Sequence, residues 1–472
     1  MMWRTVFILE WRILRRDRAV LACLLIFAVM LLAAGLMSGR HDRMVAQGVQ
    51  QALNDEESRL ADLRTKQSQL VASDAPRRSK DPRDPGWMGK VGGVRLAPLP
   101  RLPLNAVAVG QSDLQPRLVQ LSTAADISAF SEVETPLMGP TRMGTGPFDP
   151  AFLFVVLFPL VVIAVTYEVL SGERERGTLA MLLSQPMSQL ELVAGKAAAR
   201  FGLVTATALA FALLSLWLAQ VDVFETRAWT AVGLYLAVIF AWAFFWFALA
   251  VFVNARGSSS ANNALTLVGL WLVLVVVVPG LVQVVLDTVY PPPSQVEMLH
   301  EARERAKDVG KEVAVLKGRH DIDTQTKEYG KKLVQAERSL TEREAPLKAE
   351  WQRQNQIRTK AIRFAQFLSP AMVVQLALED IAGTGVLRYT RFDEQLEAFH
   401  HTFREFYFGR IEQGRVFGSD DFARIPTFVF REEATANLAS RVLLGVLVML
   451  MLGLALVFGS RRGLRTIGRL SN

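Results

Sequence analysis

The sequence contains a single cysteine, Cys23, in 472 residues. A chain with one cysteine forms no internal disulfide, which excludes a small disulfide-stapled secreted scaffold. Charged residues are also few, at 21%, whereas 51% of the residues are hydrophobic. This balance excludes an intrinsically disordered chain and is too apolar for an ordinary soluble protein.

The short motifs that would indicate a catalytic centre are missing as well. The sequence has no G-x-x-x-x-G-K-[ST] loop for ATP, no H-E-x-x-H, no cysteine-based metal site and no G-x-S-x-G elbow. His400-His401 is flanked by Glu397 and Glu405. Adjacent residues on a helix do not share a face, so a solvated or interfacial pair is favoured over a metal site. We expect no enzymatic activity of the chain itself, no metal and no cofactor bound by it.

The apolar residues gather in six long blocks separated by charged segments, and the mean hydropathy is +0.24. A helix needs roughly 20 apolar residues to cross a bilayer, and about 17 suffice. The pattern predicts an all-α polytopic membrane protein, with Pro279-Gly280 kinking the fifth span. The predicted transmembrane helices are 19–37, 151–167, 201–219, 229–253, 264–286 and 442–458.

The net charge of +8 comes from basic residues at the edges of these spans. Such an excess is typical of the cytoplasmic side of a membrane protein, so nucleic-acid binding is not expected. Both termini, including the tail 459–472, and two connections are therefore predicted to be cytoplasmic. The residues that carry the argument are Arg4, Arg12, Arg15, Arg16, Arg18, Arg174, Arg176, Lys196, Arg200, Arg256, Arg461, Arg462, Arg465 and Arg469.

The first 18 residues contain an aromatic stripe at helical spacing. Trp3, Phe7, Trp11 and Leu14 fall on one face, and arginines occupy much of the other. This pattern predicts an interfacial amphipathic helix over 1–18, on membrane lipid, rather than a merely basic tail. The apolar core of the span that follows has 19 residues, which is longer than in a signal peptide, so cleavage is not favoured.

Two long inserts, 38–150 and 287–440, separate the spans on the other side and are predicted to be periplasmic. Met44–Val71 has helical composition, whereas the Pro- and Gly-rich remainder of the first insert is expected to be irregular or short-stranded. In the second insert, 297–367 is expected to form a helical hairpin or coiled-coil arm, against which the Met44–Val71 helix can pack; the alternative is a single solvated helix. The inserts make a mainly helical extracytoplasmic domain.

The segment 168–200, between the second and third spans, is the most informative. The span ends in an acidic residue, a glycine breaks the helix, and a short amphipathic helix follows that a proline stops. Such a helix at the membrane surface is suited to docking in a groove of a soluble partner; the alternative is an ordinary charged turn. The candidate residues are Glu168, Glu173, Glu175, Gly177, Thr178, Leu179, Leu182, Leu183, Pro186 and Lys196.

The run E-x4-E-R-E-x-G-T-L-x2-L-L-x2-P-x8-G-K resembles the signature of the permease subunits of type-two ATP-binding-cassette exporters. In that family this segment is the coupling helix, which enters the ATPase subunit. The resemblance implies two copies of a partner ATPase that carries ATP and Mg, a second permease, identical or related, and a place in the bacterial inner membrane. It also implies that Glu168 to Lys196 carry coupling.

The large inserts are similar to those of a bacterial permease subfamily catalogued as a domain of unknown function. Three functions stay open on the sequence. The chain exports an unidentified substrate, transmits ATP-driven motion to a periplasmic protein, or serves as a membrane-anchored scaffold. The matching residues are Leu368-Ser369-Pro370, Gln375, Gly383-Thr384, Phe392, Phe399 and Ile425-Pro426-Thr427-Phe428.

Overall fold

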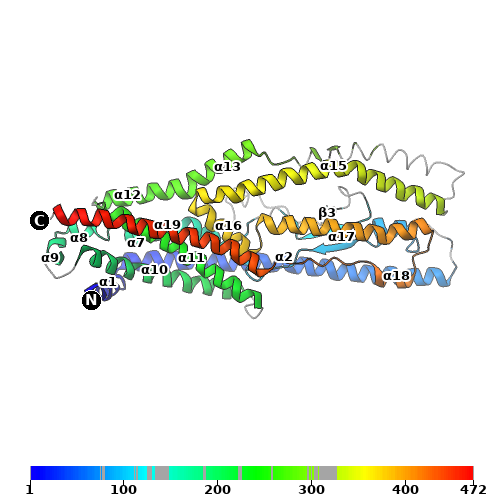
Figure 1. Cartoon of the computed structure of the whole chain (residues 1–472). Coiled ribbons are helices and arrows are strands. Elements are labelled where there is room, and N and C mark those ends of the chain that lie inside the picture. Colours follow the sequence, from blue (N-terminus) through cyan, green and yellow to red (C-terminus); the bar gives the residue numbers. More distant parts are fainter. Residues whose placement is uncertain are drawn as a thin grey trace.

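The computed structural model describes an elongated, almost wholly helical chain in which a helix bundle continues into a second, distal domain (Figure 1). Both termini lie at one end of the bundle, which we call the basal end. The described residues are 2–470 without 75, 77–79, 111, 113–114, 125–129, 133–147, 184–187, 222–225, 257–258, 295–296, 299, 302–303, 305–306 and 308–326.

Within the described part of the chain, six helical segments are long and apolar enough to cross a membrane. The predicted all-α polytopic membrane protein is confirmed, although every helix is longer than its apolar block. The third begins at Gln189, where Ser188 and Glu191 form a capping box, twelve residues before its predicted apolar block 201–219. The segments are α2 (Arg18–Ala72), α6–η3–α7–α8 (Pro150–Glu175), α10 (Gln189–Leu218), α11 (Thr226–Asn254), α12–η4–α13 (Ser260–Val289) and α19 (Thr435–Leu470).

Helix α11 forms the centre of the bundle, and its Tyr235, Trp242 and Trp246 are fully buried. Helices α2 and α10 approach each other closely because glycines face small residues. A Cβ atom at Gly35 would lie 2.9 Å from Ser215 Cβ, and one at Gly39 would lie 2.7 Å from Ala219 Cα. Glycines four residues apart are a common way to bring membrane helices into contact.

Two spans contain a π-helical turn directly before a proline. The turn η3 (Leu153–Leu157) precedes Pro159 in α7 (Phe158–Thr166), and η4 (Leu272–Val277) precedes Pro279 in α13 (Val278–Val289). Proline has no N–H, so in the π register the carbonyl five residues earlier loses its donor.

Side chains from neighbouring helices satisfy both of these carbonyls. The indole Nε1 of Trp242 donates to the Phe154 carbonyl at 2.8 Å, and the Ser369 hydroxyl donates to the Leu274 carbonyl at 2.6 Å. The break expected at Pro279 is therefore a widened turn whose freed carbonyl is hydrogen-bonded inside the bundle.

Helix α2 leaves the bundle without a break and becomes part of the distal domain (Figure 1). It packs there on α18 (Ser419–Arg424), and Leu60 and Leu63 contact an aromatic cluster that includes Phe403 and Tyr407. Beside it lie α3 (Pro85–Trp87), η1 (Met88–Gly92), η2 (Asn105–Val107) and an antiparallel sheet, β1 (Arg95–Pro98), β2 (Leu118–Leu121) and β3 (Phe130–Glu132).

The expected helical arm is represented by α15 (Lys327–Ala365), a single helix that passes through Pro346 without ending. Its main partner is α17 (Val386–Gln413) rather than the Met44–Val71 part of α2. Arg338 pairs with Glu405 and Glu412 along this contact. The first half of the expected hairpin falls largely on 308–326, outside the described residues.

The second insert does not stay outside the bundle as the sequence suggested. After α15, the turn η5 (Gln366–Leu368) leads to α16 (Pro370–Ala382), which packs between α11 and α19. Ser369, at the tip, bonds to Leu274, the fifteenth residue of the 30-residue span Ser260–Val289. The tip of this re-entrant hairpin therefore lies near mid-depth of the bundle. The hairpin could not be recognised from the sequence, because α16, with 13 residues, is too short to be counted as a membrane span.

Candidate functional site

The segment predicted to dock a partner lies at the basal end, between α7 and α10 (Figure 1). It folds as two short helices, α8 (Ser171–Glu175) and α9 (Leu179–Leu183). Gly177 joins them with a φ of +70°, a left-handed conformation that a residue with a Cβ adopts only with strain. Thr178, just before α9, donates its hydroxyl to the Glu173 carboxylate.

Buried ion pairs connect this segment to the helices around it. The Lys196 ammonium lies 2.5 Å from Glu173 and 3.6 Å from Glu10, a residue of α1 (Met2–Leu14). Arg200 lies 2.7 Å from Glu10 and also donates to the Val165 carbonyl at the end of α7. We call Glu10, Glu173, Lys196 and Arg200 the basal lattice; it joins α1, α7, α8 and α10.

A second set of polar contacts joins α8 to the start of the fifth span. The Ser260 backbone N–H donates to the Glu175 carboxylate at 2.7 Å, and the Ser171 and Ser260 hydroxyls lie 2.8 Å apart. The fully buried Asn263 amide bonds to Ser171 and to Asn254 in α11. Movement of α8 would therefore act on α11 and α12 as well as on α10.

The side chains of Leu179 and Leu182, on the apolar face predicted for α9, point inward. Leu179 is buried and Leu182 is partly buried, in a cluster with Leu170, Leu192 and Val193. Among the described side chains of α9, that of Met181 is exposed to solvent, at 65%. The Leu183 side chain and Pro186 lie outside the described residues. Glu168 pairs with Arg176 of the same segment, at 3.4 Å.

Helix α1 packs along α10, and its place on the membrane surface stays a prediction. A Cβ at Gly195 would lie 2.9 Å from the Trp3 carbonyl, so the glycine permits the close approach. Phe7 and Trp11 stack with ring centroids 6.0 Å apart and are half-buried, and Leu14 is buried. The exposed apolar residues of α1 are Trp3, Ile8, Leu9 and Ile13.

Sequence reasoning missed Glu10, Arg200 and Asn263. Glu10 is one of two acidic residues, with Asp17, among the arginines before the first span, a signal that was available. Arg200 was noticed only as a basic flank. Asn263 gave no signal, because its role depends on the position of α8.

Among the described residues, no group of three or more His, Cys, Asp or Glu side chains is placed to hold a metal ion. His400 is fully buried, and its Nε2 lies 2.9 Å from the Ser122 carbonyl, whereas His401 is exposed. The pair is therefore divided between the interior and the surface of the distal domain.

Comparison with known families gives the setting of this site. A family model described as "ABC-2 family transporter protein" matches residues 4–464. No curated protein matches the chain. Members of this family are membrane subunits of ATP-binding-cassette transporters and work with a separate ATPase. Together with the six candidate spans, the match shows that the chain belongs to the ABC-2 transporter family, as a permease.

Proposed function

We propose that the chain couples ATP hydrolysis on a separate ATPase to export of a substrate, and that α8 and α9 form the contact with that ATPase. The observation that carries the proposal is the basal lattice. Lys196 and Arg200 have side chains only 10% exposed and Glu10 only 4%, so this set of charges is held away from water.

A buried, paired charge resists separation. Removing one member of such a pair typically costs about 3–5 kcal/mol, because the other is left uncompensated. A displacement of α8 is therefore expected to carry α1 and α10 with it instead of breaking Glu173 from Lys196. The contacts of Glu175 and Asn263 extend the same argument to α11 and α12.

The arrangement of the whole complex is part of the proposal. The basic residues at the basal end support a cytoplasmic location for both termini and a periplasmic one for the distal domain, in a bacterial inner membrane. Two ATPase copies, with ATP and Mg, and a second permease, identical or related, would complete the transporter.

The test uses the full chain in nanodiscs with the ATPase that co-purifies with it. Met181→Asp places a charge on the exposed part of α9 and is expected to lower ATPase association. Val429→Asp, at a site 75% exposed in the distal domain, is the matched control and should leave association unchanged. Equal association of both variants would refute the assignment of α9.

Lys196→Met tests coupling separately from docking. Because Lys196 is buried and Met181 of α9 remains exposed, the variant should still bind the ATPase but show reduced ATP turnover or transport in the complex. Lys332→Met, in the exposed Lys332–Glu328 pair of α15, is the control for loss of a lysine charge. Normal ATP turnover and transport in the Lys196→Met complex would show that the basal lattice is not needed for coupling.

One observation favours a second function, ATP-driven transmission of motion to a periplasmic partner. Helix α2 is unbroken for 55 residues, about 80 Å at 1.5 Å per residue, and spans from the bundle to the far end of the distal domain. Spin labels at Val71 and Lys360, in a Cys23→Ala background, would report movement of α2 against α15. An ATP-dependent distance change without substrate release would favour this function over export.

A further inference from the structure

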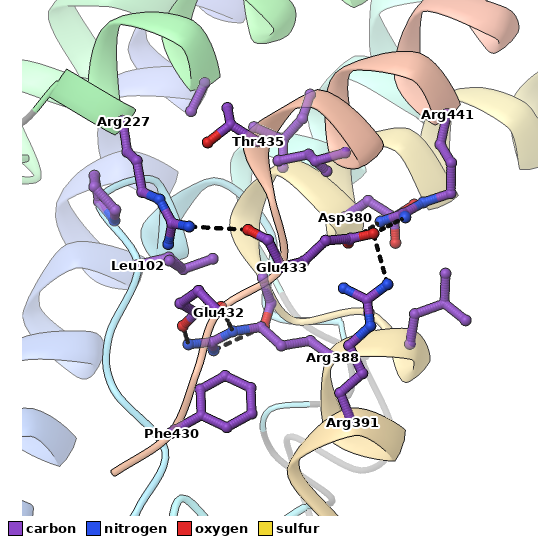
Figure 2. Close-up of a pocket in the computed structure, with 17 residues that line it drawn as sticks. Leu102, Arg227, Asp380, Arg388, Arg391, Phe430, Glu432, Glu433, Thr435 and Arg441 are labelled. Carbon is purple, nitrogen blue, oxygen red and sulfur yellow. Dashed lines mark hydrogen bonds and ion pairs between the residues drawn. The ribbon is translucent and has the colours of Figure 1, made fainter. Parts of the chain in front are cut away.

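A pocket of about 70 Å³ opens at the distal edge of the bundle, far from the basal lattice (Figure 2). Its walls come from the outer ends of α11, α16, α17 and α19, from Leu102 and Pro103, and from the irregular segment before α19. Gly383, the left-handed cap of α16, lets the chain turn at the pocket wall. The pocket is small enough to hold a single compact polar group rather than a large substrate.

Seven of the 17 residues that line the pocket are charged. Four arginines and three acids line it, an excess of one positive charge; they are Arg227, Arg388, Arg391, Arg441, Asp380, Glu432 and Glu433. Arg388 uses four of its five N–H donors, two on the Glu432 carboxylate and one each on the Gly383 and Pro100 carbonyls. The other three arginines come from different helices and meet at Glu433 (Figure 2).

Each of these three arginines has N–H groups beyond those that bond to Glu433. Arg227 donates to the Glu433 carbonyl at 2.9 Å through one nitrogen, and Arg391 donates to the Glu433 carboxylate at 2.6 Å through one nitrogen. Arg441 binds the carboxylate with both terminal nitrogens, at 2.6 and 2.7 Å. Its buried Nε has no hydrogen-bond partner among the described residues and lies 3.6 Å from Asp380. A guanidinium has five N–H donors, so capacity for another anion remains.

The pocket lies at the level expected for lipid headgroups. Trp229, two residues after Arg227 at the start of α11, is 65% exposed. Trp217, in the last turn of the preceding helix α10, is 71% exposed. Exposed tryptophans at the ends of membrane helices typically mark the bilayer interface. The walls also include the apolar side chains of Leu102, Ala231 and Leu438.

We propose that this pocket binds the anionic headgroup of an amphiphile from the adjacent leaflet. Arg227, Arg391 and Arg441 would hold its phosphate or carboxylate, and its apolar part would follow Ala231 and Leu438 toward the bilayer. Arginine forks match the planar and tetrahedral oxyanions of such groups. Glu433 occupies part of this arginine set in the structure, so it competes with the ligand. The site does not depend on whether the complex exports a substrate.

The test measures lipid retention by native mass spectrometry of the full chain, from nanodiscs of phosphatidylcholine doped with phosphatidylglycerol. Arg391→Gln should weaken retention of phosphatidylglycerol about tenfold, the loss of one charge-assisted hydrogen bond. Arg338→Gln, which removes an exposed arginine from the α15–α17 contact, is the matched control and should retain it normally.

Glu433→Gln gives the decisive second result. It frees Arg391 and Arg441 and should increase retention of phosphatidylglycerol, whereas a purely structural cluster would only lose stability. Equal retention by native and Arg391→Gln protein, or reduced retention by Glu433→Gln, would overturn the proposal. A thermal shift with free inorganic phosphate, but none with phosphatidylglycerol, would also overturn it, because the anion would then come from solution.

Discussion

Ser369→Ala isolates one hydrogen bond at the tip of the re-entrant hairpin. Ser369 is fully buried, and its hydroxyl donates to the Leu274 carbonyl at 2.6 Å. That carbonyl has no backbone donor in reach, because the Val278 N–H bonds to Val273 and Pro279 has no N–H. The substitution changes little volume, so the expected loss is that of the orphaned carbonyl.

The expected loss in the free energy of unfolding follows from two general ranges, for an unpaired buried acceptor and for an interhelical hydrogen bond. Leaving a buried acceptor unpaired costs about 1–3 kcal/mol. Interhelical hydrogen bonds in membranes contribute about 0.6 kcal/mol on average and about 1.7 kcal/mol at most. Since Leu274 has no alternative donor, we expect Ser369→Ala to lower the free energy of unfolding by about 1.5 kcal/mol.

The assay is equilibrium unfolding in mixed detergent–dodecyl sulfate micelles, followed by tryptophan fluorescence. Ser215→Ala is the matched control: its buried hydroxyl donates to the Ala212 carbonyl inside α10, which also accepts the regular helical bond. That variant should lose less than about 0.5 kcal/mol.

Pro279→Ala provides the refuting experiment. An alanine there restores an N–H that can reach the Leu274 carbonyl, so Ser369→Ala should cost less than about 0.5 kcal/mol in this background. If Ser369→Ala costs the same in the native chain and in the Pro279→Ala background, the orphaned carbonyl is not the source of the effect and the reasoning is wrong.

Three further predictions concern other parts of the chain. Gly39→Ala should lower the free energy of unfolding by about 1–3 kcal/mol, because its Cβ would meet Ala219. Gly48→Ala, in the same helix but with open space around it, should raise the free energy of unfolding by about 0.5–1 kcal/mol. If the two variants unfold alike, the α2–α10 contact is contradicted. Trp242→Phe should cost about 3 kcal/mol, from lost packing and the unpaired Phe154 carbonyl, and Pro159→Ala should recover part of it in the same assay. Burial raises the pKa of Glu433, but hydrogen bonds from Arg441 and Arg391 outweigh it and hold the pKa at about 2. The carboxylate of Glu433 therefore contributes to stability above pH 4.5, its ordinary pKa, and this contribution is lost as the pH falls toward 2. The difference in the free energy of unfolding between native and Glu433→Gln protein should be constant from about pH 6 to 8 and should narrow below pH 4.5. A difference that narrows instead between about pH 6 and pH 8 would contradict the ion pairs.

The segment 168–200 shows how far local pattern reasoning reaches. The glycine break at Gly177 and the short helix after it could be predicted, because both depend on backbone preferences of neighbouring residues. The direction of Leu179 could not, since an amphipathic helix has an apolar face whether it packs on its own chain or on a partner. Only the position of α10 decided that this face points inward.

The sequence by itself determined that the chain has six apolar spans and ends in basic tails, because the length and charge of each segment set its preference for lipid or water. It also singled out the candidate residues of the segment 168–200. The tertiary structure alone decided that α16 returns into the bundle, that Glu10 joins Lys196 and Arg200, and that three arginines meet at Glu433. These contacts join residues up to 206 positions apart, from Arg227 to Glu433, and no local propensity specifies which distant side chains will meet.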